Sequence, residues 1–564
     1  VSSFSGSEAE SDKLLVKENS ILYIDLRHRF RELDESNSVA LFSDRSEQPS
    51  SAYDLIRSIN YAKKDDKIKG IYIRTGGSPN GLATLQQVRN ALKDFKQSRK
   101  FIYAYGDYIP QSDYFVASVA DSVFINPLGI VEVKGLATNL AFFKGTLDKL
   151  NIQPEIFYNG QFKSATEPFR LQKMSDPSRL QLASFQKTIW QEMLVAASEH
   201  TKADTATINA WAQNGTIQTA QDAVRYKLAD GLRYKDQIEQ LMKSKTGLAA
   251  TEKVKLVSVA TYRGSIPATI AENQIALLVA EGEIVDGEAG DYSNQIASET
   301  FIKEIRKISD NDAVKAVVLR VNSPGGSALA SEVILRELQL LHRKKPLVVS
   351  MGNVAASGGY YISCASDSIF VLPTTITGSI GVFGMMFNTE DFFNEKLGVT
   401  FDTEKNAPYA DFPNVTRPLT EMERRFIQQS VDTIYATFKN RVATGRKLDL
   451  SVVDSIAQGR IWSGTAAIEN GLADKIGGLD RALESAAALA KLEDYKLVRY
   501  PAPADKFEKI LRMVASSTSG EKVTVAGMLE KELGKEYPWF RTLRSMRDQK
   551  NKIWMMMPYS IEIQ

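Results

Sequence analysis

One serine lies in a glycine-rich turn, where its hydroxyl could act as a nucleophile. The turn is Ser357-Gly358-Gly359 and it follows an apolar segment, and an earlier turn after another apolar segment contains Gly325 and Gly326. Glycine lets another backbone approach closely, so N–H groups of Gly325 or Gly326 and of Gly358 could converge on one oxygen atom. A serine beside such donors is the outline of an acyl-transfer site. A phosphate cradle or a simple packed turn would use the same residues.

The two turns alternate with strand-like and helix-like segments that would have to position them. Residues 314–321 and 347–351 are short apolar runs, and helical spacing covers 328–341 and 360–366. Strand, glycine turn and helix, repeated in this order, predict a parallel α/β unit. In such a unit ligands and chemistry lie at the carboxyl ends of the strands. Both turns are therefore expected at the same edge of one sheet.

The residues alone leave open which base would activate the serine. The three histidines, His28, His200 and His342, all lie outside Gly/Ser-rich loops. Lysine is an alternative base when burial lowers its pKa. Lysine and arginine together number 70, so composition cannot select one of them.

Four motifs give the sequence a specific resemblance. They read GQFKSATEPF at 160–169, VNSPGGS at 321–327, MGNVAASGGYYIS at 351–363 and TGSIGVFG at 377–384. In this order they resemble the signal peptide peptidase A (protease IV) family of serine–lysine peptidases, in its double-length form. The resemblance covers nearly the whole chain. It implies that Ser357 is the nucleophile, Lys163 the general base and Ser379 the partner that orients the lysine amine.

The resemblance also implies a setting for this chemistry. The fold would be a Clp/crotonase-like α/β domain, present twice, and the substrates would be peptides such as cleaved signal peptides and unfolded chains. No metal or cofactor is implied. Family members form homo-oligomers, here expected to be a tetramer, at the bacterial inner membrane with the catalytic part on the periplasmic side. The chain starts at Val1 with a polar leader, so we expect that a membrane anchor preceded it.

An internal repeat supports the double-length form. One constant displacement aligns Gly106 with Gly352, Arg74 with Arg320 and Tyr114 with Tyr360, so each half should have one fold. The predicted organisation is a leader (1–19), a first α/β repeat (20–250), a second α/β repeat (251–500) and a C-terminal extension (501–564). The extension contains a helical run at 506–514 and ends in IWMMMPYSIEIQ, which we expect to pack against the body.

The halves differ where the chemistry is expected. Gln111 stands opposite Ser357, so the first half lacks the nucleophile. The part of the second half that matches Lys163 is EKNAPYAD at 404–411, whose Lys405 we interpret as a surface residue. The first repeat would therefore supply the lysine and the second repeat the serine.

Composition excludes several other functions. At 564 residues the chain is too long for one core. Its net charge of +2 gives no reason to expect nucleic-acid binding, and a single cysteine, Cys364, excludes an internal disulfide. Two alternatives stay open beside the peptidase. One is a crotonase-like acyl-CoA hydratase or isomerase, which needs a catalytic carboxylate, and the other is a non-catalytic membrane scaffold.

Overall fold

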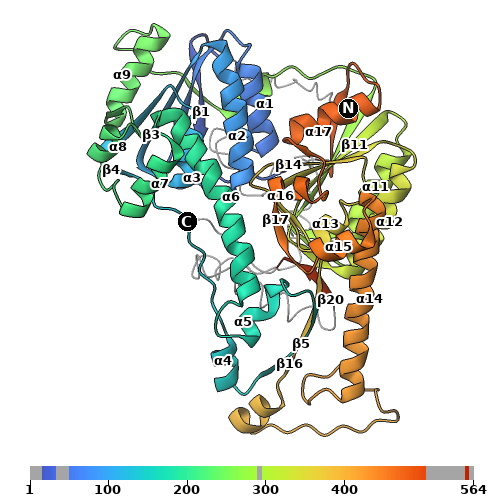
Figure 1. Ribbon diagram of the computed structural model, residues 1–564. Coiled ribbons are helices and arrows are strands. Elements are labelled where there is room, and N and C mark those ends of the chain that lie inside the picture. Colours follow the sequence, from blue (N-terminus) through green and yellow to red (C-terminus); the bar gives the residue numbers. More distant parts are fainter. Residues whose placement is uncertain (1–15, 33–49, 289–294, 503–552, 558–564) are drawn as a thin grey trace, which may run out of the picture. The chain divides into compact units, whose positions relative to one another are not determined.

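The computed structural model describes residues 16–32, 50–288, 295–502 and 553–557 (Figure 1). The chain forms two compact units. The first takes in Val1–Ala137 and Ile189–Ile270, and the second takes in Thr138–Thr188 and Ala271–Glu562. Among the described residues, no helix combines the length and the apolar character needed to cross a membrane. The helical run expected at 506–514 lies outside the described residues.

The first unit is built on a six-stranded sheet in which every pair of neighbours is parallel. In spatial order its strands are β6 (Gly231–Leu232), β4 (Ser122–Val131), β3 (Phe101–Ile109), β2 (Ile68–Arg74), β1 (Ser20–Asp25) and β7 (Leu256–Ser258). The accompanying helices are α1 (Ala52–Ala62), α2 (Leu82–Phe95), α3 (Gln111–Ala117), α7 (Thr205–Asn214), α8 (Ala220–Arg225), α9 (Lys235–Thr246) and α10 (Val259–Tyr262).

The second unit contains a larger, mostly parallel sheet. Its main order is β17 (Ile461–Ser463), β15 (Ile376–Gly378), β13 (Leu347–Ala356), β11 (Val314–Ser323), β8 (Gln274–Glu281) and β19 (Lys496–Tyr500), and β14 (Ser368–Val371) and β18 (Lys475–Ile476) extend it beside β13. Val317, Val318 and Leu319 in β11 have no exposed surface. A parallel strand that is covered on both faces reads as a continuous apolar run, which is why β11 was recognisable from the sequence.

Helices cover this sheet and join its strands. They are α11 (Ser298–Asp310), α12 (Ala328–His342), α13 (Gly358–Tyr361), α14 (Glu421–Arg446), α15 (Leu450–Ile456), α16 (Gly464–Glu469) and α17 (Leu479–Leu489). The start of α12 is fixed by Ser327, whose hydroxyl accepts a hydrogen bond from the Ala330 amide at 3.2 Å. This cap places the residues just before it, Gly325 and Gly326, at the end of β11.

A second sheet of the same unit was not foreseen. Its order is β10 (Gln295–Ala297), β9 (Glu283–Val285), β12 (Gly325–Ser327), β20 (Ile553–Met556), β16 (Val382–Asn388) and β5 (Gln153–Asn159). β5 pairs antiparallel with β16 over seven residue pairs, from Asn159–Val382 to Gln153–Asn388. The segment that carries Lys163 thereby belongs to the second unit, together with α4 (Lys144–Lys149), α5 (Glu167–Arg170) and the first part of α6 (Asp176–Thr201).

The element order repeats along the chain, as the sequence repeat predicted. The series β1, α1, β2, α2, β3, α3, β4 in the first unit is matched by β8, α11, β11, α12, β13, α13, β14 in the second. In each series the strands pair in parallel, with the middle strand, β2 or β11, between its two neighbours. The predicted α/β fold class with a tandem duplication is confirmed.

Candidate active site

Ser357 lies at a sharp turn between a strand and a helix. β13 ends immediately before it and α13 (Gly358–Tyr361) begins immediately after it. Its φ of 56° and ψ of −117° are dihedral angles that residues with side chains rarely adopt. The Ser357 amide donates to the Gly378 carbonyl at 2.8 Å, which holds this conformation. The helix expected over 360–366 is instead a single turn that starts at Gly358.

The two glycines after Ser357 are needed for close packing. A side-chain carbon at Gly358 would lie 2.7 Å from Ser331 Oγ, and one at Gly359 would lie 2.6 Å from the Ser323 carbonyl oxygen. Both distances are shorter than van der Waals contact allows. The Ser-Gly-Gly sequence therefore lets the turn press against the loop between β11 and α12.

Lys163 reaches Ser357 within the same chain. Its Nζ lies 3.0 Å from Ser357 Oγ, 3.1 Å from Ser379 Oγ and 3.2 Å from the Ser379 carbonyl oxygen. All three side chains are buried, and Lys163 is 1% exposed. The structure thus brings together the predicted nucleophile, base and orienting residue, although Lys163 precedes Ser357 by 194 residues.

The surroundings of Lys163 favour its neutral form. Burial lowers its pKa well below the ordinary value, because the charged ammonium loses its hydration. A protonated lysine has three donors and no acceptor, whereas the neutral amine has two donors and one lone pair. The three oxygen contacts suit the neutral amine, which can donate to both Ser379 oxygens and accept the Ser357 hydroxyl proton.

The predicted oxyanion donors lie next to one another, and the structure separates their roles. The Gly325 amide donates to Ser323 Oγ at 3.2 Å, so it is already engaged. The Gly326 nitrogen lies 3.2 Å from the point where a Gly358 side-chain carbon would be. Of the two alternatives that the sequence left open, we therefore predict Gly326, together with Gly358, as the pair of amides that would bind a carbonyl oxygen.

Two residues that sequence reasoning missed hold the lysine loop in place. Gln181 on α6 is 1% exposed, and its amide nitrogen donates to Phe162 O and Ser164 Oγ, each at 3.0 Å. Its amide oxygen accepts from the Ile461 amide at 3.1 Å. Gln181 therefore fastens the residues on both sides of Lys163 to the start of β17. Its only signal in the sequence was a polar residue on a helix face that it shares with the buried Phe185.

Gly459 is the second missed residue. It has a φ of 72°, and a side-chain carbon there would lie 2.6 Å from Lys163 Cβ. Its amide donates to Ile380 O at 2.8 Å, and the next residue, Arg460, accepts from the Ser379 amide at 2.7 Å. The turn at 458–460 thus contacts Lys163 and Ser379 at once.

In the first unit, side chains occupy the backbone amides of the region that corresponds to the Ser357 turn. Gln111 accepts hydrogen bonds from the Lys134 and Gly135 amides at 2.9 and 3.0 Å. The Asp113 carboxylate accepts from the amides of Gly76, Gly77 and Ser78 at 2.8 to 3.1 Å, which fills the loop between β2 and α2. That loop corresponds to the one holding Gly326 in the second unit.

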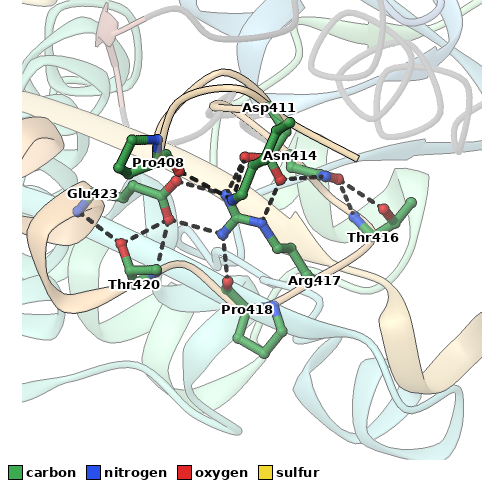
Figure 2. Close-up of polar contacts among 9 residues, drawn as sticks. Pro408, Asp411, Asn414, Thr416, Arg417, Pro418, Thr420 and Glu423 are labelled. Carbon is green, nitrogen blue, oxygen red and sulfur yellow. Dashed lines mark hydrogen bonds and ion pairs between the residues drawn. The ribbon is translucent and has the colours of Figure 1, made fainter. Parts of the chain in front are cut away.

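The counterpart of Lys163 in the second half is a surface loop. Lys405 is exposed and forms an ion pair with Asp411 at 3.0 Å. Figure 2 shows the cluster around it, in which Arg417 binds Asp411 at 2.7 Å and Glu423 at 2.6 Å. The Arg417 guanidinium and the Thr420 groups lower the pKa of Glu423 to about 2. Lys405 is a surface residue, as interpreted from the sequence, and it contributes to a charged network at the start of α14.

The arrangement provides the groups that acyl transfer needs. The Ser357 hydroxyl contacts the buried Lys163 amine, and the backbone amides of Gly326 and Gly358 belong to the two adjacent turns. In the part of the chain that the structure describes, no group of three or more His, Cys, Asp or Glu residues could hold a metal ion. Fold and site together define a serine hydrolase with a lysine beside its nucleophile.

The comparisons identify the family. The family model described as peptidase family S49 matches residues 94–249 and 339–493, one match in each half. "Protease 4" of Salmonella typhi is 35% identical over 85% of this chain and 77% of its own length. "Serine protease SPPA, chloroplastic" of Arabidopsis thaliana is 30% identical over 84% of this chain and 71% of its own. A solved structure of a ClpP1 mutant from Listeria monocytogenes covers 37% of this chain and 94% of its own, with 14% identity and a TM-score of only 0.24.

The chain belongs to peptidase family S49, in the form with two family domains. It is a serine peptidase and a homologue of protease IV, which confirms the resemblance read from the motifs. The hydratase and scaffold alternatives are set aside by this membership.

Proposed function

We propose that this chain is a membrane-associated endopeptidase in which Ser357 is the nucleophile and Lys163 the general base, and that it degrades cleaved signal peptides and other small apolar peptides. The observation that carries the proposal is the 3.0 Å contact between Lys163 Nζ and Ser357 Oγ in a fully buried site. Burial lowers the pKa of the lysine amine in this environment, which favours the neutral form that can accept a proton.

The reaction follows from these positions. Lys163 Nζ takes the Ser357 hydroxyl proton while Oγ bonds to the substrate carbonyl carbon. The carbonyl oxygen becomes an anion that the Gly326 and Gly358 amides stabilise. The Lys163 ammonium then gives its proton to the leaving amine as the C–N bond breaks. Water, deprotonated by Lys163, hydrolyses the serine ester in the same way. Ser379 holds the Lys163 amine in position during both steps.

The substrate class is supported by the sheet beside the site. A peptide would bind as a strand beside β12 or β16 in the position of β20, which gives main-chain hydrogen bonds independent of sequence. Apolar residues surround this region, including Ile284, Ile380 and Val382, each without exposed surface. These features favour extended, apolar peptides over folded proteins.

The membrane, location and assembly parts of the proposal are supported by the motif resemblance alone. We propose a tetramer at the bacterial inner membrane, anchored by a segment outside this chain and facing the periplasm. Light scattering tests the assembly, because an active particle with the 62.6 kDa mass of one chain would contradict it. Cell fractionation of the natural protein tests the location.

The decisive experiment compares Ser357→Ala with Ser366→Ala, a nearby serine whose hydroxyl bonds only to the Ser363 carbonyl among described residues. Ser357→Ala should lower turnover of a fluorogenic apolar peptide by a factor of order 10⁶ and abolish labelling by a serine-reactive probe. Ser366→Ala should keep both. A Ser357→Ala variant within tenfold of the parent rate would refute the assignment.

A further inference from the structure

The guanidinium of Arg460 contacts two aromatic rings beside the candidate active site. Its central carbon, Cζ, lies 5.1 Å from the centre of the Phe162 ring and 4.1 Å from that of the Trp462 ring. Both distances are within the roughly 6 Å over which an aromatic face attracts a cation. In the described part of the chain Arg460 forms no ion pair, and its Nε is buried without a hydrogen-bond partner. The aromatic contacts therefore hold this guanidinium in place.

The first ring belongs to the segment that carries the predicted base. Phe162 directly precedes Lys163 and is buried. Its amide donates to the Gln458 carbonyl at 2.9 Å, so the lysine loop and the turn that contains Arg460 are also joined by their backbones. The Arg460 carbonyl accepts from the Ser379 amide at 2.7 Å. Arg460 therefore contacts the segment of the base through its side chain and the orienting residue through its backbone.

The second ring packs against the segment that holds the nucleophile turn. Trp462 in β17 pairs with Thr377 in β15. A side-chain carbon at Gly378 would lie 2.7 Å from the Trp462 indole, so the ring and this glycine are in close contact. The Gly378 carbonyl is the acceptor for the Ser357 amide, at 2.8 Å. A shift of the Trp462 ring would therefore reach Ser357 through a single residue.

The aromatic partners of Arg460 have an electrostatic consequence. An arginine that is removed from water is usually paired with a carboxylate. A carboxylate close to Lys163 would favour the protonated amine, which cannot act as a base. The faces of the Phe162 and Trp462 rings attract the guanidinium without adding a negative charge. This arrangement can hold the site together and still leave the base in its neutral form.

We infer that Arg460 is a positioning residue of the peptidase site, because its guanidinium holds together the ring that precedes the base and the ring that packs beside the nucleophile turn. This inference rests on the proposed peptidase function. A guanidinium keeps its proton at any working pH, so its contacts persist while Lys163 titrates. Loss of the cation should lower kcat and leave KM nearly unchanged, since it misplaces the base and the nucleophile and not the peptide.

Two variants with unbranched side chains separate charge from packing. Arg460→Lys keeps a cation that can contact both rings, and Arg460→Met fills the space without a charge. With a fluorogenic apolar peptide, we expect kcat within about tenfold of the parent for the lysine variant and a loss of about 10²-fold for the methionine variant, with KM within about twofold in both. In the methionine variant the pH midpoint of the rate should move upward, because water that enters beside Lys163 favours the protonated amine.

A small cation tests the same contact from solution. Arg460→Ala leaves a space beside the two rings, and ethylguanidinium at concentrations too low to unfold the parent should raise its kcat at least about tenfold. Ethylurea has nearly the same shape and no charge, so it should have no effect. Arg74→Ala is the matched control. Arg74 lies 4.9 Å from the centre of the Tyr105 ring in the first unit and is paired with Asp107. This variant should keep the parent kcat and respond to neither compound.

The outcomes distinguish the inference from the function on which it rests. A kcat for Arg460→Met that equals or exceeds that of Arg460→Lys would show that packing alone matters. Rescue of Arg460→Ala by both compounds or by neither, or a change confined to the unfolding temperature, would have the same meaning. Each of these results would overturn the inference while the parent still hydrolyses the peptide. Absence of hydrolysis by the parent would overturn the peptidase function as well.

Discussion

At the scale of single residues, Lys163 makes opposite contributions to stability and to activity. In the unfolded chain its pKa is roughly 10.4, and in the folded chain burial lowers it. Between the two pKa values the unfolded state binds more protons, so the free energy of unfolding rises with pH across this window. Below the folded pKa both states are protonated and the full burial penalty is present. The neutral amine that the reaction needs is thus gained at a cost in stability at lower pH.

Lys163→Met should therefore be inactive but more stable than the parent near neutral pH. The gain is about 1.4 kcal/mol for each pH unit between the unfolded pKa and either the folded pKa or the working pH, whichever of these two is higher. It should shrink as the pH approaches roughly 10.4. Urea unfolding of both proteins across this pH range measures the difference.

Activity of the parent should rise with pH through the lowered pKa of Lys163, because only the neutral amine accepts the Ser357 proton. Lys163→Arg serves as the matched control, since guanidinium keeps its proton at any working pH and should be inactive throughout. An active arginine variant would show that the base is another residue.

At the scale of elements, the lysine loop depends on a helix that takes no part in the chemistry. Gln181 joins α6 to both neighbours of Lys163 and to β17. Gln181→Met keeps the volume of this side chain and removes all three hydrogen bonds. We expect kcat to fall by about 10²-fold with KM little changed, since a small misplacement of a base has this effect. The pH midpoint of the rate should also move, because a loosened loop admits water to Lys163.

Gln186→Met is the control for this prediction. Gln186 lies on the same helix and makes one side-chain hydrogen bond, to Thr138 Oγ1 at 2.9 Å. It should leave kcat and the pH midpoint unchanged. If Gln181→Met changed only the unfolding temperature, Gln181 would stabilise the fold without positioning the base.

The elements that were predicted from the sequence share one property. Each has a local pattern of apolar residues that are buried in the fold. β11 and β13 are apolar runs inside a parallel sheet, and α12 has a cap and an apolar face, so local residues determine all three. β12 and β20 have three and four residues and pair across more than two hundred positions. No local pattern encodes such a pairing, and the second sheet was therefore missed.

The same distinction applies to the candidate site. Ser357 and its glycines are recognisable because the turn needs small residues for steric reasons. Lys163 was found only through the motif around it, since nothing in its local sequence reveals the Gly459 backbone that packs against it. Gln181 acts through hydrogen bonds to residues elsewhere in the fold, so its local sequence gave almost no indication of its role. The catalytic roles of Ser357, Lys163, Ser379 and the glycines stay predictions that the variants above test.

At the scale of the whole molecule, the repeat boundary and the structural boundary differ. Residues 138–188 come from the first half of the sequence but fold with the second unit, where β5 pairs with β16 along its full length. A chain cut between the repeats would therefore separate Lys163 from the unit that contains Ser357.

Fragments 1–250 and 251–564 test this arrangement. Neither should hydrolyse peptides alone, because one lacks the nucleophile and the other lacks the base. Mixing them should restore activity if β5 docks again beside β16, and a first fragment with Lys163→Ala should fail to restore it. Hydrolysis by 251–564 alone at the parent rate would refute the composite site.

The Asp113 carboxylate binds the backbone of the loop between β2 and α2 in the first unit. In the first unit the Asp113 carboxylate accepts hydrogen bonds from three backbone amides, in the loop that corresponds to the one where the second unit would hold the oxyanion of an intermediate. The carboxylate thereby crosslinks the start of α3 to the loop before α2. A substrate oxygen that entered this loop of the first unit would find its amides already engaged by the chain's own side chain.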